Sequence, residues 1–139
     1  MKKLIALCLT FVVLFVVACP VSAAQQQEIS PQYANIRMTQ TELTILDNGL
    51  ATVTVTAIAN SGVTQIKAVT HIERFVNGRW YLAYIGGAET SWEDISYSTE
   101  FSKAYTAQLS SAGTYRAVTE FTVTGTTVET ITKTAQAVY

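Results

Sequence analysis

From residue 36 to the end of the chain, apolar and polar residues alternate in short runs separated by turn sequences. In residues 51–59, alanine and valine at the odd positions alternate mostly with threonine at the even ones. Successive side chains of a strand point to opposite faces, so this segment has one face suited to burial and one that carries hydroxyl groups. Residues 66–76 show the same period, with Ile66 on one face and His71 on the other. The alternation predicts half-buried β-strands.

Turn sequences recur at intervals close to the length of a strand. They are Asp47-Asn48-Gly49, Asn60-Ser61-Gly62, Asn77-Gly78, Ser111-Ala112-Gly113 and Gly125-Thr126. Glycine and asparagine reach the positive φ angles that tight turns require. The number and spacing of the runs predict an all-β fold, an antiparallel β-sandwich of about seven strands over residues 36–139.

Two segments depart from plain alternation. Residues 79–85 are apolar on both faces, which predicts a central strand or a strand whose outer face meets another surface. Residues 89–95 are short and contain Thr90 and Ser91, and we expect a loop with at most one turn of helix there. No segment after residue 35 has the apolar period of an amphipathic helix.

The beginning of the chain has the features of an export signal in their required order. Lys2 and Lys3 provide a positively charged start, an apolar run interrupted only by Thr10 covers residues 4–18, and Val21-Ser22-Ala23 supplies small residues before a cleavage site. The sequence therefore predicts a secreted, extracellular protein.

Cleavage is expected after Ala23 or Ala24, which gives three segments. Residues 1–24 form the signal peptide, residues 25–35 a flexible N-terminal segment, and residues 36–139 the sandwich domain. The apolar run is shorter than the roughly 20 residues of a membrane-spanning helix, which disfavours a retained anchor.

A lipid anchor is a second alternative to release. Val16-Val17-Ala18-Cys19 resembles the bacterial lipoprotein box, in which the cysteine is lipidated and becomes the first mature residue. Pro20 and Val16 depart from the usual pattern of that box. Lipidation of Cys19 implies a domain tethered to the outer face of the membrane.

Removal of the signal changes the composition in two ways that restrict function. Both cysteines, Cys8 and Cys19, lie in the opening stretch, so the released domain has no thiol for a disulfide, a nucleophile or a metal site. Loss of two lysines leaves seven basic and ten acidic residues, a net charge of about −3. The basic residues are scattered singly, so we expect no nucleic-acid partner.

The sequence offers little catalytic chemistry. The only histidine, His71, lies two residues from Glu73 on the same strand face, which favours a surface pair over a general base. Glu73 and Glu120 are one possible carboxylate pair for glycoside hydrolysis, but the sequence does not give their separation. Phosphate loops, nucleophile elbows and His-Glu-x-x-His pairs are absent. We therefore expect no catalysis and no cofactor, with a hydrolase as the minor alternative.

The densest acidic patch consists of Glu89, Glu93 and Asp94. Carboxylate oxygens suit a hard cation such as calcium, but the patch lacks the regular ligand spacing of a calcium loop. We therefore expect a solvated loop and no metal site.

A resemblance to a known fold rests on Ser111-Ala112-Gly113-Thr114-Tyr115-Arg116. Gly-x-Tyr at the start of an alternating strand resembles the entry to strand F of immunoglobulin-like domains, where the tyrosine hydroxyl bonds back to the preceding corner. Antibody-type members carry a cysteine two residues later, where this chain has Ala117, so the resemblance implies a variant without a disulfide. It also implies that Trp80 is the core tryptophan, although Trp80 directly follows a turn.

The whole layout is similar to small uncharacterised secreted proteins of clostridial Gram-positive bacteria. The likeness rests on the signal, the strand hairpins, the Gly78-Arg79-Trp80 turn and the threonine-rich ending. The resemblance implies the fold and the extracellular location of the protein, and it implies no activity.

Aromatic residues are the remaining candidates for binding. Trp92 and Tyr97 fall in the predicted loop region, where an exposed aromatic ring suits stacking on a sugar or packing in a protein pocket. The alternative for Trp92 is a structural role, in a loop that folds back and caps the end of the sandwich. We expect a non-catalytic interaction or adhesion module whose partner is a protein or a glycan. The alternative is a lipid-anchored accessory domain of the cell envelope.

Overall fold

The computed structural model describes residues 33–85 and 88–139 of the chain. The predicted signal peptide and the predicted flexible segment up to residue 32 lie outside the described residues. The strands are β1 (Ile36–Ile45), β2 (Leu50–Ala59), β3 (Gln65–Val76), β4 (Arg79–Leu82), β5 (Tyr84–Ile85), β6 (Ala88–Glu89), β7 (Ser91–Ser96), β8 (Glu100–Gln108), β9 (Thr114–Thr124) and β10 (Val128–Val138). In this part of the chain no helix is long and apolar enough to cross a membrane.

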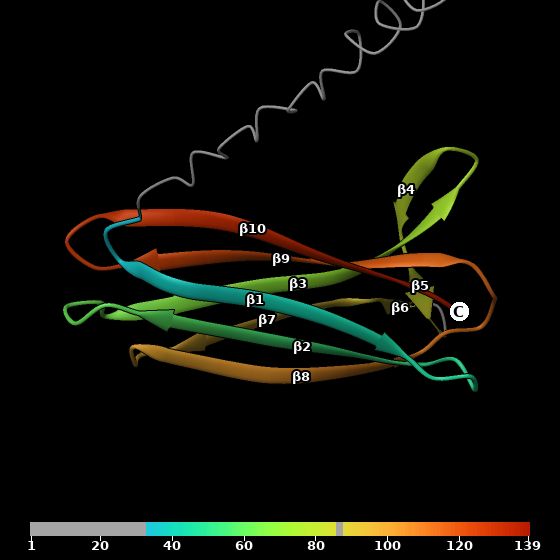
Figure 1. The fold of residues 1–139 in the computed structure, drawn as a ribbon, viewed down its shortest axis with the longest axis horizontal. Helices are drawn as coiled ribbons and strands as arrows, with labels where there is room; N and C mark the ends of the chain where they lie inside the picture. The colour runs from blue at the N-terminus through green and yellow to red at the C-terminus, as the bar shows by residue number, and fades with distance from the viewer. Residues whose placement is uncertain (1–32, 86–87) are drawn as a thin grey trace, which may run out of the picture. The chain divides into compact units, whose positions relative to one another are not determined.

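Two antiparallel sheets form the layers of a sandwich (Figure 1). One sheet has the order β1-β2-β8, and the other has the order β10-β9-β3 with β4 and β7 both paired to β3. When β4 and β7 are counted together as the fourth strand, the first, second and fifth strands are β1, β2 and β8, which share one sheet. The third, sixth and seventh strands are β3, β9 and β10, which share the other. This partition is that of immunoglobulin-like sandwiches, and it confirms the predicted fold class.

The edge strand beside β3 is split into two pieces. The N-terminal half of β3 pairs with β7, and its C-terminal half pairs with β4. The change occurs at Ile72, whose amide donates to the carbonyl of Thr90 and whose carbonyl accepts from the amide of Ala83. The short β5–β6 hairpin is inserted between these two partners. Thr90 stabilises the point where β3 changes partner. Its buried hydroxyl lies within hydrogen-bond distance of two carbonyl oxygens, 3.0 Å from that of Ile72 and 2.9 Å from that of Ala83.

This split strand corrects two predictions. Residues 79–85 are not a central strand, because β4 lies at the end of its sheet and β5 belongs to the inserted hairpin. Residues 89–95 are not a loop, because Ser91–Ser96 forms β7 and pairs with β3 along its length. A local pattern misses both features because the exchange of partners at Ile72 is decided by pairing between distant segments.

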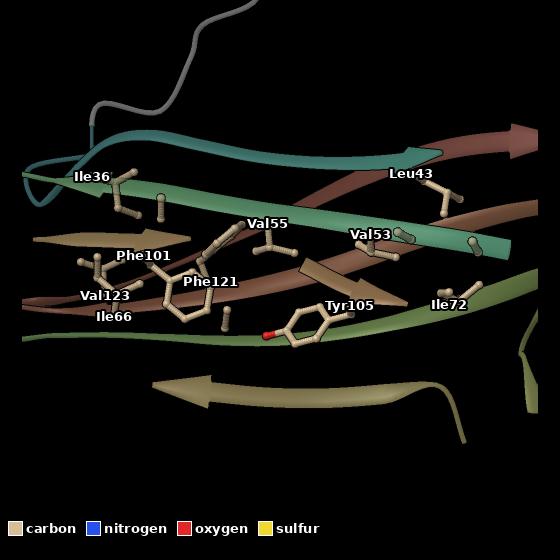
Figure 2. Close-up of a cluster of buried hydrophobic side chains, with 14 of the residues drawn as sticks. Ile36, Leu43, Val53, Val55, Ile66, Ile72, Phe101, Tyr105, Phe121 and Val123 are labelled. Carbon is tan, nitrogen blue, oxygen red and sulfur yellow. The ribbon is translucent and has the colours of Figure 1, made fainter. Parts of the chain in front are cut away.

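The core lies between the two sheets and is built from the alternating positions (Figure 2). Val53 and Val55 of β2 and Ile66, Phe121 and Val123 of the opposite sheet all have buried side chains. Burial of each such side chain stabilises the fold by roughly 1.5–3 kcal/mol. The period of two in the sequence therefore predicted the buried face of β2 correctly, and it separated the two faces of β3, of which the one with Ile66 is buried.

The tyrosine corner implied by the resemblance is present. The Tyr115 hydroxyl donates a 2.7 Å hydrogen bond to the carbonyl oxygen of Ser111, and the ring is buried. Trp80, however, is not the core tryptophan. It lies on the hairpin formed by β3 and β4 and contacts Phe75, with the ring centroids 5.0 Å apart. The hairpin of β3 and β4 extends beyond the sandwich (Figure 1), and Trp80 is not among the described residues that form the core or pack against it.

The strand β1 is tied to the end of the β9–β10 turn. Buried Asn35 donates from its side chain to the carbonyl oxygen of Thr127, at 2.8 Å. The backbone amides of Ala34 and Asn35 donate to the carboxylate of Glu129. The last residues of the segment predicted to be flexible are therefore held in place, and the ordered domain begins before Ile36.

Candidate functional site

The hairpin of β3 and β4 stands out from the sandwich (Figure 1). Its turn consists of Asn77 and Gly78, with φ angles of 50° and 82°. Two consecutive positive φ angles define the two-residue turn whose twist matches that of the flanking strands. Because the hairpin extends beyond the layers, Phe75, Val76 and Tyr81 are exposed, Tyr81 to 52%.

One face of the hairpin is braced against β9. The guanidinium of Arg116 lies over the Trp80 ring, 4.4 Å from its centroid, and its Nε donates to the carboxylate of Glu73. Trp80 in turn contacts Phe75 across the hairpin. A cation over an indole ring and an ion pair that is mostly shielded from solvent both stabilise this arrangement. The bracing holds the projecting hairpin in one orientation.

The other face of the hairpin forms one wall of a groove of about 400 Å³. Arg74 and Tyr81 are directly opposite each other on this face. The second wall is the connection from β8 to β9. The lining residues are Arg74, Val76, Tyr81, Leu82, Ala83, Leu109, Ser110, Ser111 and Tyr115. Most of this lining is apolar or aromatic, and the volume falls in the range typical of ligand sites.

Arg74 is the single charged residue of the groove. Its Nη2 donates to the carbonyl oxygen of Ala112 at 2.9 Å, and its guanidinium carbon lies 5.9 Å from the centroid of the Tyr115 ring. Its buried Nε has no hydrogen-bond partner among the described residues. A Cβ atom on Gly113 would lie 3.1 Å from that Nε, so glycine permits the close approach of the loop. None of the ion pairs formed within residues 33–85 and 88–139 includes Arg74.

The two predicted ligand contacts, Trp92 and Tyr97, lie apart from this groove. Trp92 is on β7 rather than in a loop, and its ring stacks on Tyr105 with centroids 5.0 Å apart and planes 9° from parallel. It packs against the core, so one ring face is already occupied. Tyr97 is 80% exposed on the connection to β8, and its role as a ligand contact stays a prediction.

The carboxylates of the predicted acidic patch interact with different partner residues. Asp94 accepts from the Tyr105 hydroxyl at 2.8 Å and pairs with Lys103 at 3.2 Å. The Tyr105 hydrogen bond is the main cause that lowers the pKa of Asp94, and burial is the main cause that raises the pKa of Tyr105. Glu93 pairs with Lys67 at 2.9 Å, and the side chain of Glu89 lies outside the described residues. Among the described residues, no group of three metal-binding side chains is found.

The residues considered for catalysis lie on the sheet that contains β3 and β9, on the face that points away from the core. His71 Nε2 is 3.4 Å from the carboxylate of Glu73, which also binds Arg116. Arg116 lies directly opposite Glu73, and Glu120 is four residues further along β9. Four residues of strand place the backbone positions of Glu73 and Glu120 about 13 Å apart along the strand direction. Glycoside hydrolases need their carboxylates about 5–9.5 Å apart, so this spacing disfavours that pair.

The sequence did not predict the groove as a whole. The Asn77-Gly78 turn predicts a hairpin, and alternation on either side of it places Arg74 and Tyr81 on one face. That signal identifies one wall. The other wall comes from Leu109 and Ser111, and no local pattern connects these residues to the hairpin.

Comparisons with known proteins identify no family for this immunoglobulin-like domain. No protein-family model matches the chain. A search of curated proteins also found no match. The class of the protein thus rests on its fold, and its function must be argued from the site.

Proposed function

We propose that this chain is a secreted, non-catalytic interaction module that binds an extracellular protein or glycan through the β3–β4 hairpin. The observation that carries the proposal is the combination of exposure and bracing in that hairpin. Val76 and Tyr81 project apolar surface into solvent while Arg116 holds the opposite face in place. A pre-ordered apolar surface binds with a small loss of conformational entropy, as interaction surfaces require.

The non-catalytic part of the proposal is supported by the engagement of the ionisable side chains. Glu73 is bound to Arg116, Asp94 to Tyr105 and Lys103, and Glu93 to Lys67. Carboxylates paired in this way stabilise the domain and are poor general acids or bases, because their charge is already neutralised by a neighbour.

The extracellular part is supported by the order of features in residues 1–24. Intact-mass analysis of the protein from its host, taken from both the culture medium and the membranes, tests it. A chain that begins at Ala24 or Gln25 supports release. An acylated chain that begins at Cys19 supports the alternative, an accessory domain tethered to the envelope.

The binding surface is tested with the exported protein carrying a fluorescent label. We expect saturable binding to cell surfaces or to the isolated envelope, and at least about a tenfold loss of affinity in Val76→Ser/Tyr81→Ser. The matched control is Val128→Ser, which removes an exposed apolar side chain beside the β9–β10 turn, and this turn lies at the end of the sandwich opposite the β3–β4 hairpin (Figure 1). Equal losses in the two variants, or no saturable binding by the parent protein, would contradict the proposal.

A further inference from the structure

We propose that the groove binds an extended segment of a protein partner that presents a carboxylate beside an apolar side chain, with Arg74 as the contact for the carboxylate. This inference rests on the proposed function and specifies its ligand. Three features of the groove carry it: the charge of Arg74, the composition of the walls, and the free edge of β4.

Arg74 brings an unneutralised positive charge to a largely apolar lining. A guanidinium group carries a delocalised positive charge and five N–H donors. One donor is used by the Ala112 carbonyl oxygen, and no carboxylate of the described residues pairs with the group. A ligand carboxylate therefore gains a charge-assisted hydrogen bond here that a neutral isostere lacks.

The walls specify what accompanies the carboxylate. Val76, Leu109 and the ring of Tyr81 present apolar surface, and the Tyr115 hydroxyl is already used in its hydrogen bond to the Ser111 carbonyl oxygen. A polyanionic glycan needs several cations and many hydrogen-bond partners, whereas the groove holds one cation and the released chain has a net charge of about −3. These features favour a single carboxylate in an apolar context, as in a peptide with an acidic residue next to an aromatic or aliphatic one.

The edge of β4 offers main-chain contacts to an extended peptide. In a hairpin with a two-residue turn, the residues that flank the turn form a hydrogen-bonded pair, and such pairs alternate along the strands. The backbone groups of Trp80 and Leu82 therefore point away from β3. None of the described strands pairs with that side of β4. Leu82 also lines the groove, so an added strand and the groove contacts are available to one ligand.

The inference is tested by fluorescence anisotropy with four labelled hexapeptides and the exported protein. The first is Thr-Val-Phe-Glu-Val-Thr with blocked ends, the second and third replace Glu by Gln or Lys, and the fourth replaces Val, Phe and Val by Ser. We expect the first peptide to bind at least about tenfold tighter than each of the others. In Arg74→Gln the preference for Glu over Gln should disappear.

Two further variants keep the test decisive if Arg74→Gln is poorly folded. Tyr81→Ser alters an exposed wall and should weaken the Glu and Gln peptides equally, while Val128→Ser, exposed and outside the groove, should bind like the parent. Equal affinity for the Glu and Gln peptides overturns the inference. So does binding of heparin or oligogalacturonate at the groove in competition with the first peptide.

The outcomes separate this inference from the proposed function. If Val76→Ser/Tyr81→Ser loses binding to cells but the Glu peptide shows no preference, the hairpin is a binding surface and the ligand chemistry is wrong. If that variant binds cells like the parent protein, the hairpin is not the binding surface and both proposals fail.

Discussion

The hydroxyl of Tyr115 donates a 2.7 Å hydrogen bond to the carbonyl oxygen of Ser111, four residues earlier in the chain. This bond fixes the β8–β9 connection, which forms one wall of the groove, to the strand that follows it. The same connection accepts a hydrogen bond from Arg74 through the Ala112 carbonyl oxygen. A fold-stabilising contact thus also sets the position of the candidate binding site.

Tyr115→Phe should lower the free energy of unfolding by about 1 kcal/mol, because it removes one shielded hydrogen bond and keeps the buried ring. Urea unfolding followed by tryptophan fluorescence measures the change. Tyr81→Phe is the matched control, since Tyr81 is exposed and lies in the same groove. Unchanged stability in Tyr115→Phe would show that the corner does not depend on the hydroxyl.

Trp92→Ala should destabilise the domain by about 2–3 kcal/mol, because it removes the ring stacked on Tyr105 and part of the core packing. Tyr97→Ala should change stability by less than about 0.5 kcal/mol, because the ring is almost fully exposed. Thermal unfolding of both variants separates a structural tryptophan from a surface tyrosine. Similar midpoints for the two variants would mean that the stacked pair contributes little.

Sequence alternation predicted the layers of the fold because burial on a strand has a period of two and is visible locally. The odd positions of residues 51–59 are buried as expected, and the Tyr115 corner was implied by a short motif. The split edge strand was not predicted, because β3 changes its partner from β7 to β4 at Ile72, where contacts remote in sequence meet. Thr90 itself is a typical loop residue whose role depends on two carbonyl groups that only the fold brings together.

The candidate site, like the fold, was predictable from the sequence only where the signal is local. Alternation around the Asn77-Gly78 turn is sufficient to place Arg74 opposite Tyr81. The groove needs the β8–β9 connection as well, and the approach of Gly113 to Arg74 is a tertiary contact. Trp92 illustrates the opposite error, since polar neighbours indicated exposure while pairing with β3 placed its ring against the core.

The buried hydroxyl groups of Thr70 and Thr119 lie 3.0 Å apart on neighbouring strands. Replacing one threonine by valine leaves the other hydroxyl without this partner, so Thr70→Val should cost about 1–3 kcal/mol. The double variant Thr70→Val/Thr119→Val removes both polar groups at nearly constant shape and should be more stable than either single variant. A double-mutant cycle from urea unfolding gives the coupling. Purely additive losses would show that the two hydroxyl groups do not satisfy each other.

Alkaline pH should destabilise the domain through the hydrogen bond between Tyr105 and Asp94. Burial raises the pKa of Tyr105 above that of an unfolded tyrosine, with a further contribution from Asp94. The folded state therefore binds the phenolic proton more tightly than the unfolded state does. The resulting stability is fully present below about pH 10 and decreases as the pH rises towards the pKa of the folded state. The Asp94 carboxyl has the opposite dependence, because its pKa is lowered: its contribution is lost as the pH falls below about 4.

Tyr105→Phe isolates this dependence. The variant should be less stable than the parent protein near pH 7, and the difference between the two should shrink between about pH 10 and 11, where the parent alone loses the phenolic contribution. The ion pair of Lys103 with Asp94 is common to both proteins and cancels in the comparison. Urea midpoints measured at neutral and alkaline pH test the prediction, with Tyr81→Phe as the control for an exposed tyrosine. A constant difference across this range would mean that Tyr105 titrates alike in the folded and unfolded chains, and that burial beside Trp92 does not hold its proton.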